Sequence, residues 1–402
     1  MQTQLADFIK NTPDGKLADE ILRSCVHCGF CNATCPTYLL LGDENDGPRG
    51  RIYLMKQLLE AQDVGQKTLK HLDRCLTCRN CETTCPSGVK YEKLLDIGRR
   101  VAEERIPRDK NDSKFRKRLL SFLPYPTRFK AALKMGRTFK FILPKSTTGK
   151  IPKKRKTGNW PKQVHKRKML VLAGCVQPAL SPEINSSTAR VLDKLGITLI
   201  QENKAGCCGA VSQHLSASDA AKDFMRNNID AWWTHIENGV EAIVMTASGC
   251  GSMVKDYGHH LSDDPDYAQK ARKVSSLCKD ISEILINERY QIFTRNDREN
   301  ITWHPPCTLQ HGQKITGVVE KILQDIGYQL KPIADQHLCC GSAGTYSILQ
   351  PELSERLRER KLDSIKQQNP TTIVTANIGC QTHLQEKTET PVKHWIHLLD
   401  QE

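Results

Sequence analysis

The stretch Cys25-Val-His-Cys28-Gly-Phe-Cys31-Asn-Ala-Thr-Cys35-Pro36 decides the fold of the first part of this 402-residue chain. Its spacing, C-x2-C-x2-C-x3-C-P, returns as Cys75-Leu-Thr-Cys78-Arg-Asn-Cys81-Glu-Thr-Thr-Cys85-Pro86. Three thiolates at steps of three residues can surround one corner of a cubane iron–sulfur cluster. The fourth cysteine, followed by proline, lies too far along the chain to close the same cluster. The sequence therefore predicts two [4Fe–4S] clusters.

Each predicted cluster takes three cysteines from one motif and the fourth from the other, as in two-cluster ferredoxins. The first cluster is assigned to Cys25, Cys28, Cys31 and Cys85, and the second to Cys75, Cys78, Cys81 and Cys35. Zinc is the alternative, but zinc sites use separated pairs of Cys or His in tetrahedral sets. Three consecutive short gaps closed by Cys-Pro, present twice, favour iron–sulfur clusters.

The residues between the two motifs predict a helix where a small ferredoxin has a hairpin. Apolar residues recur there at helical spacing, at Ile52, Leu54, Met55, Leu58 and Leu59. We therefore expect a helical two-cluster ferredoxin-type domain over residues 1–104. Arg49 and Arg51 of the same segment either tune a cluster or dock a partner, or else form structural ion pairs on a solvated face.

The second half of the chain contains one cysteine pattern twice. Its first copy has Cys175, Cys207, Cys208 and Cys250, and its second copy has Cys307, Cys339, Cys340 and Cys380. A Gly follows the Cys-Cys pair in both copies, and the flanks of the last cysteine agree (TASGC and TANIGC). Such self-similarity predicts two tandem structural units, which we place at residues 169–290 and 291–402.

Each unit alternates apolar strand candidates with helical stretches. The expected strands are 169–173, 197–201 and 241–246 in the first copy, and 301–303, 328–333 and 371–375 in the second. Alternating short apolar strands and helices predict parallel α/β layers. The fold class is therefore multidomain α+β and α/β, and the cysteines lie past the carboxyl ends of strands, where open α/β sheets place their sites. Trp232 and Trp233 are expected in the core or at an interface, and Cys278 in the core.

Composition bounds the compartment and the partners. Residues 1–16 are polar and acidic where a signal peptide is basic and then apolar, and no run approaches 18 apolar residues. We expect a cytoplasmic chain, whose 17 cysteines are then metal ligands or redox thiols and not disulfides.

The positive charge is concentrated in residues 105–168, which contain 22 Lys and Arg against Asp109 and Asp112 alone. Within this linker, residues 118–145 mix Phe, Leu and Ile with Arg and Lys and contain no acid. Such a composition suits an interfacial helix on an anionic membrane, over about residues 127–143, and it equally suits docking to an acidic partner subunit. No nucleic-acid recognition motif accompanies the charge, so no nucleic-acid partner is expected.

Hydride chemistry is not visible in the sequence. No G-x-G-x-x-G follows a strand candidate and no Walker A sequence is present. No catalytic residue is assigned. The abundant one-electron chemistry indicates a chain that receives electrons from a flavin on another subunit.

The words CVHCGFCNATCPTY, GDENDGPRGRIYL, NNIDAWW, TASGCG, HLCCGSAGTY and TANIGCQTH together resemble the iron–sulfur subunits of bacterial glycolate oxidase (glycolate dehydrogenase). The resemblance implies two CCG cysteine-rich domains and electron transfer from FAD-binding partner subunits that oxidise glycolate to glyoxylate, and also D-lactate. It implies quinone as the acceptor and a peripheral position on the cytoplasmic face of the inner membrane.

The chain departs from the cluster-binding relatives at one point. They close each repeat with C-x2-C, whereas Met253 and His383 stand at that position here. The eight repeat cysteines therefore hold one or two further clusters, or they are structural or redox thiols. Alternative functions are an iron–sulfur subunit for glycerol-3-phosphate or lactate oxidation, and a disulfide reductase of the heterodisulfide type.

Overall fold

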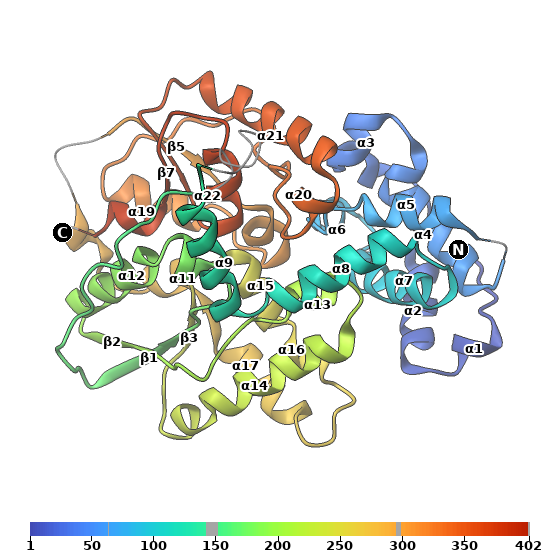
Figure 1. The fold of residues 1–402 in the computed structure, drawn as a ribbon, viewed down its shortest axis with the longest axis horizontal. Helices are drawn as coiled ribbons and strands as arrows, with labels where there is room; N and C mark the ends of the chain where they lie inside the picture. Colours follow the sequence, from blue (N-terminus) through green and yellow to red (C-terminus); the bar gives the residue numbers. More distant parts are fainter. Residues whose placement is uncertain (63, 142–151, 295–298, 401–402) are drawn as a thin grey trace.

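The computed structural model describes residues 1–62, 64–141, 152–294 and 299–400. Figure 1 shows the N-terminal helices gathered on one side of the molecule and two α/β parts stacked on the other. The predicted fold class, a helical dicluster domain followed by two α/β parts, is confirmed.

The N-terminal part is helical within the described residues. Its elements are α1 (Asp7–Lys10), α2 (Pro13–Ser24), η1 (Phe30–Thr34), α3 (Pro36–Leu41), η2 (Glu44–Asp46), α4 (Pro48–Leu59), α5 (Gln66–Asp73), α6 (Asn80–Thr84) and α7 (Tyr91–Arg105). Proline opens α2, α3 and α4, where its missing N–H has no helical partner to lose. The helix expected between the cysteine motifs is α4. It packs closely against α7: a Cβ added at Gly98 of α7 would lie 2.5 Å from the sulfur of Met55 on α4.

The first repeat folds around a parallel sheet in the order β2-β1-β3-β4. Its strands are β1 (Arg167–Val171), β2 (Ile197–Gln201), β3 (Ile243–Met245) and β4 (Cys278–Asp280). Its helices are α11 (Gln177–Leu180), α12 (Glu183–Lys194), α13 (Ala210–His214), α14 (Ser218–Glu237), α15 (Ser248–Lys255), α16 (Tyr257–His260), α17 (Ala268–Leu277) and α18 (Ile281–Leu285). Trp232 and Cys278 are buried in its core, as expected.

The second repeat has a smaller parallel sheet in the order β5-β6-β7. The strands are β5 (Ile301–His304), β6 (Thr372–Thr375) and β7 (Val392–His394). Around them lie η3 (Tyr290–Phe293), η4 (Thr308–Gly312), α19 (Val318–Asp325), α20 (Tyr346–Leu349), α21 (Pro351–Lys366), α22 (Ile378–Gln385) and η5 (Trp395–Leu398).

The strand expected at residues 328–333 is wrong, because that segment is irregular. In the first repeat, β2 occupies the corresponding edge position and pairs with β1. Pro332 has no N–H to give to a ladder, so this segment can offer a neighbouring strand one hydrogen bond fewer.

The two repeats share one hydrophobic core. It joins Val244 and Leu285 of the first repeat to Trp303 and Trp395 of the second, and its members extend from residue 169 to residue 399. The His394 Nε2 atom lies 2.8 Å from the Thr246 carbonyl oxygen, so the sheets are also tied by a buried hydrogen bond. Burial of this shared surface supplies the main free energy that holds the repeats together.

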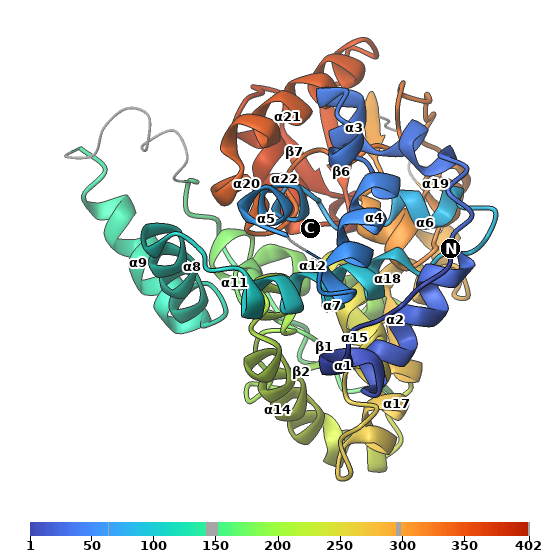
Figure 2. The same ribbon diagram turned by 90° about the vertical axis from the view of Figure 1, so that its right-hand side faces the viewer.

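The described residues of the basic segment include two helices, α8 (Lys110–Phe122) and α9 (Pro126–Thr138). Figure 2 shows them side by side at one edge of the molecule. The helix expected over about 127–143 corresponds to α9, and residues 142–145 of the expected amphipathic segment lie outside the described residues. The expected linker at 151–168 is irregular over 152–166. Among the described helices, none is long and apolar enough to cross a membrane.

Candidate metal centres

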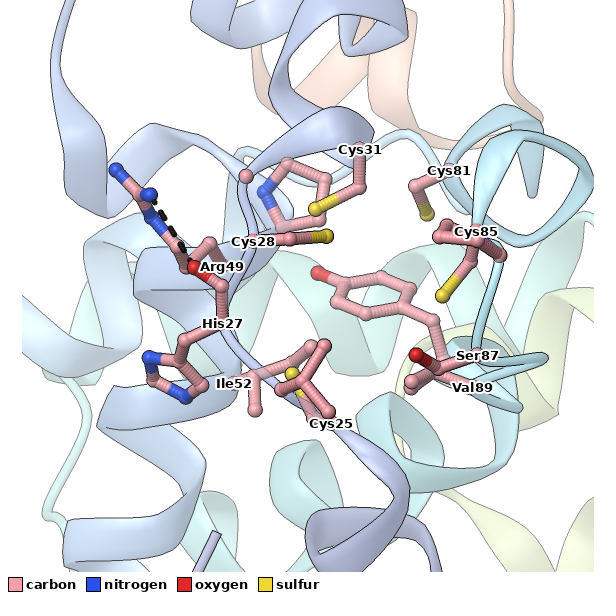
Figure 3. Close-up of a pocket in the computed structure, with 15 residues that line it drawn as sticks. Cys25, His27, Cys28, Cys31, Arg49, Ile52, Cys81, Cys85, Ser87 and Val89 are labelled. Atoms are coloured by element: carbon pink, nitrogen blue, oxygen red, sulfur yellow. Dashed lines mark hydrogen bonds between the residues drawn. The ribbon is translucent and has the colours of Figure 1, made fainter.

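Five predicted ligands line one hollow in the N-terminal domain; four of them are assigned to the first cluster, and the fifth, Cys81, to the second. Figure 3 shows Cys25, Cys28 and Cys31 of the first motif facing Cys85 of the second across this hollow. We call these four residues the outer thiol set. Burial and the neighbouring thiols Cys25 and Cys85 raise the pKa of Cys31 to about 11. Crowded thiols with raised pKa values fit a soft cation, which would replace their protons.

The other four predicted ligands form a second group, which we call the inner thiol set: Cys35, Cys75, Cys78 and Cys81. Burial raises the pKa of Cys81 well above its ordinary value, and the nearby Cys78, Cys75 and Cys35 thiols raise it further. The structure thus brings Cys35 beside the second motif, just as it brings Cys85 beside the first. The side chains are thus arranged as in two-cluster ferredoxins, where the fourth cysteine of each motif joins the three cysteines of the other.

The loops that curl these thiols inward have the same backbone in both motifs. His27 and Gly29 have positive φ angles of 55° and 84°, and Thr77 and Arg79 at the matching positions have 53° and 61°. A left-handed conformation costs about 1–2 kcal/mol for a residue with a Cβ. Three of the four positions hold such residues, so the fold accepts this strain in order to direct the cysteines at a common centre.

The two sets differ in their access to solvent. Cys28 is exposed, and the neighbouring Val26 and Phe30 are 68% and 61% exposed. In the inner set, Cys35, Cys78 and Cys81 are all buried. A partner protein can therefore approach the outer thiol set directly, whereas the inner thiol set is enclosed.

The second repeat closes the inner thiol set. Cys78 packs in one apolar cluster with Leu76 and with Cys339 and Tyr346 of the second repeat. The Asn80 amide donates to the His337 carbonyl oxygen at 3.2 Å, and the Thr83 hydroxyl lies 3.1 Å from His311 Nδ1. The N-terminal domain is therefore docked with its inner thiol set against the second repeat.

The repeat cysteines form a similar row in each repeat. In the first, Cys208 accepts hydrogen bonds from Cys207 and Cys250, and these bonds lower the pKa of Cys208 well below its ordinary value. In the second, Cys339 and Cys380 act in the same way on Cys340. The first cysteine of each copy joins the row, since Cys175 hydrogen-bonds Cys207 and the Cys307 sulfur lies 3.7 Å from the Cys339 sulfur.

Glycine is required after each Cys-Cys pair. Gly209 and Gly341 both have φ of +93°, and each donates its N–H to the sulfur of the first cysteine of its pair at 3.4 Å. A Cβ at Gly341 would lie 2.6 Å from the Ser354 carbonyl oxygen. Only glycine combines this backbone with this approach.

An imidazole distinguishes the second repeat from the first. The ring of the buried His304, at the end of β5, offers a nitrogen atom within 4.8 Å of the Cys340 and Cys380 sulfurs. Hydrogen bonding to this ring also lowers the pKa of Cys340. Leu172 stands at the corresponding place in the first repeat. Three donor atoms of metal-ligand type therefore converge in the second repeat.

Other histidines near cysteines contact neighbouring groups of the fold. His311 Nε2 lies 3.0 Å from the His337 carbonyl oxygen, and His383 lies beside Ser354 and Arg358. His27 makes an edge contact with Tyr53.

Two functional candidates escaped sequence reasoning. The Tyr91 hydroxyl donates to the Cys75 sulfur at 3.7 Å while its ring lines the hollow of the outer thiol set, so this residue stands between the two sets. His304, at the end of β5, is the second of these candidates. Neither belongs to a recognisable spacing, and only the fold brings them to the thiols.

Comparison with known proteins identifies the parts. Residues 21–89 match a 4Fe–4S dicluster domain, and residues 169–255 and 301–385 each match the cysteine-rich domain termed CCG. A crystal structure of a hypothetical protein from Helicobacter pylori has a similar fold, with a TM-score of 0.51 and 11% identity over 98% of this chain and 74% of that chain. A dicluster domain joined to two CCG domains defines an iron–sulfur protein of the oxidoreductase class, with [4Fe–4S] clusters as its cofactors.

Full-length relatives narrow the class. The chain is 52% identical to the glycolate oxidase iron–sulfur subunit of Escherichia coli (strain K12), over all of this chain and 99% of that protein. It is 28% identical to a probable glycolate oxidase iron–sulfur subunit of Bacillus subtilis (strain 168), over 92% of this chain and 90% of that one. The chain belongs to the family of glycolate oxidase iron–sulfur subunits. The resemblance of its sequence motifs to this family is thereby confirmed.

Proposed function

We propose that this chain is the electron-transfer subunit of a glycolate dehydrogenase complex. FAD-binding partner subunits oxidise glycolate to glyoxylate, and also D-lactate, and this chain conducts the electrons singly toward a quinone. The observation that carries the proposal is the pair of crossed thiol sets in the dicluster domain. Membership of the glycolate oxidase family supplies the substrate.

The two thiol sets are the proposed ligand sets. The outer thiol set, Cys25, Cys28, Cys31 and Cys85, holds one [4Fe–4S] cluster, and the inner thiol set, Cys75, Cys78, Cys81 and Cys35, holds the other. When bound, these clusters supply one-electron transfer. The chain contributes the thiolate ligands, the strained loops that aim them, and the burial that excludes water from the inner thiol set.

The different accessibility of the two sets gives the route a direction in space. The exposed Val26, Cys28 and Phe30 make the outer thiol set the place where an external donor docks. In the inner thiol set, Cys78 packs with Cys339 and Tyr346 of the second repeat, and Cys35, Cys78 and Cys81 are buried. Electrons therefore enter at the outer thiol set and leave toward the second repeat.

Metal analysis of the protein tests the ligand assignment. Anaerobically purified protein should contain at least about eight iron and eight labile sulfide per chain, the content of two cubanes. Cys85→Ser and Cys28→Ser should each remove the same cluster signal, although Cys85 and Cys28 belong to different motifs. Cys278→Ser is the matched control, because this buried thiol lies outside both sets. Zinc in place of iron, or an intact outer cluster in Cys85→Ser, would contradict the assignment.

The second repeat is the proposed place for a further centre. Cys307, Cys339, Cys340 and Cys380 lie in one row, and His304 adds a nitrogen donor that the first repeat lacks. In the first repeat, Cys175, Cys207, Cys208 and Cys250 are proposed as structural thiols. About twelve iron per chain, falling to about eight in Cys340→Ser, supports this division, whereas about eight in both proteins rejects it.

Helices α8 and α9 are the proposed contact with an anionic membrane on the cytoplasmic side. Every side chain of α9 is at least partly exposed, and Met135, Phe139 and Phe141 are 59%, 51% and 81% exposed beside Lys130 and Lys134. Apolar side chains among cations suit the interface of an anionic bilayer.

Vesicle sedimentation tests this contact. The chain should bind vesicles that contain phosphatidylglycerol and not vesicles of phosphatidylcholine alone, and added salt should release it. The double change Lys130→Glu and Lys134→Glu should abolish binding. The matched control reverses the exposed Lys273 and Lys366 elsewhere on the surface and should bind as before. Equal binding of both variants assigns the helices to a protein partner instead.

The domain limits follow the same scheme. We propose a dicluster domain at 1–104, a basic segment at 105–168, and CCG domains at 169–290 and 291–402.

A further inference from the structure

A buried arginine lies against the inner thiol set. Arg51, on α4, has a side chain that is 1% exposed. Its Nη1 atom is 3.9 Å from the Cys35 sulfur and 3.1 Å from the Thr37 hydroxyl oxygen, which is itself 3.3 Å from that sulfur. A permanent positive charge is therefore held in contact with a proposed cluster ligand.

Contacts other than the one with Cys35 hold the Arg51 side chain in place. Arg51 Nε donates to the His71 carbonyl oxygen at 2.7 Å, and Nη2 lies 3.4 Å from the fully buried carboxylate of Asp46. Asp46 also pairs with Arg74 at 2.7 Å and lies 3.1 Å from His71 Nδ1. Two arginines face one carboxylate, so Arg51, Arg74 and Asp46 together carry one net positive charge.

Among the described residues, no fully buried arginine lies against the outer thiol set, where the nearest ammonium is the part-buried N-terminus, which donates to the Cys25 carbonyl oxygen at 3.0 Å. Arg49, two residues earlier in sequence than Arg51, lies beside this set, but its guanidinium pairs with Glu44 at 2.6 Å (Figure 3 shows Arg49). Both side chains are more than a third exposed, at 37% and 42%. This pair is neutral and screened by water, so it changes the local potential little.

This difference acts on the reduced state. Each electron that a site accepts adds a negative charge, and burial opposes that charge unless a counter-charge is buried with it. We propose that Arg51 raises the reduction potential of the inner thiol set's cluster above that of the outer one, so that electrons arriving from the partner are held on the inner side. Arg51 is thus a tuning residue that acts through Cys35. This inference rests on the two-cluster function proposed above.

Redox titration of the full chain, followed by electron paramagnetic resonance, tests the proposal. Cys28→Ser first assigns the outer signal. Arg51→Gln should lower the inner midpoint so that the constant for electron partition between the two sites falls at least tenfold, which is about 59 mV for one electron. Asp46→Asn leaves both arginines charged and should raise the inner midpoint. The partition constant should then rise by a similar factor.

Opposite signs separate tuning from structural damage, since loosening of the site would move both variants the same way. The double variant Arg51→Gln with Asp46→Asn restores one net positive charge and should return the midpoint near that of the wild type. The double variant also lacks the buried Asp46 carboxylate that loses Arg51 as a partner in Arg51→Gln. Its midpoint can therefore be measured even if Arg51→Gln alone does not bind iron. Arg49→Gln is the matched control. It should change the constant for electron partition between the two sites less than threefold.

The outcomes distinguish this inference from the function on which it rests. Two cluster signals in the wild type with an unmoved midpoint in Arg51→Gln, or shifts of the same sign in Arg51→Gln and Asp46→Asn, overturn the role of Arg51 alone. Absence of two cluster signals in the wild type overturns the proposed function and this inference with it.

Discussion

Arg79 ties the dicluster domain to the first repeat, and its removal should loosen that joint. Its guanidinium contacts Glu82 at 2.9 Å and Glu92 at 2.6 Å on its own domain, and Asp256 at 3.1 Å at the start of α16. The arginine is only 15% exposed, and the three acids are 12–29% exposed. Arg79→Met keeps most of the length of the side chain and removes the charge.

The expected loss follows from what remains behind. Burial already raises the pKa of Glu92 well above its ordinary value, and Arg79 is the group that opposes this rise. Without Arg79, three carboxylates face one another in a poorly hydrated space. Removal of one partner from such a buried pair costs about 3–5 kcal/mol. At roughly 1.2 °C per kcal/mol for a chain of 402 residues, the melting temperature should fall by about 4–6 °C.

Calorimetry and hydrogen–deuterium exchange measure this loss and locate it. Faster exchange should appear in α6, α7 and α15–α16 together, because the ion group joins them. The matched control is Arg167→Met, in which an arginine that is 40% exposed also loses two carboxylate partners, Glu241 and Glu288. Surface pairs contribute about 0–1 kcal/mol each. Equal melting temperatures of the two variants would refute the reasoning.

Three further changes can be checked by denaturation midpoints. Burial raises the pKa of Asp280 to about 6 against an ordinary value of 3.8. The folded chain therefore binds this proton more tightly than the unfolded chain, and the free energy of unfolding falls by about 3 kcal/mol as the pH rises from about 4 through 6. Asp280→Asn should abolish that decline, and an unchanged slope between pH 4 and 7 would contradict the assignment. Trp232→Ala should cost about 3–5 kcal/mol, and Trp232→Phe clearly less, because the buried indole N–H has no partner to lose. Gly341→Ala should destabilise more than Gly344→Ala, in which the new Cβ meets nothing within 4 Å; the reverse order would show that backbone strain alone decides.

The crossed thiol sets could be anticipated from sequence because cluster ligation leaves few spacings open. Two motifs with the same C-x2-C-x2-C-x3-C-P pattern already direct Cys35 and Cys85 away from their own neighbours. The tandem repeats were equally visible, since cysteine positions recur at almost constant separation. Patterns of this kind survive because chemistry, and not packing, sets them.

Pairing and burial across long distances could not be anticipated. The strands β4 and β7 have three residues each, too few for periodicity to register. The expected strand at 328–333 looked apolar, but no neighbouring strand was required to pair with it. Arg51 resembled a surface arginine in sequence, and only the approach of Asp46, His71 and Cys35 encloses it. Contact between Cys78 and the second repeat is likewise a result of domain docking.

The core that both repeats share has a consequence for biosynthesis. Its members extend from residue 169 to residue 399, so the apolar face of the first repeat stays uncovered until nearly the whole chain has left the ribosome. Non-local contacts of this kind form slowly, and exposed apolar surface invites aggregation in the meantime. Nascent chains of this protein should therefore depend on chaperones until their last strand emerges, and truncation before β7 should yield insoluble material.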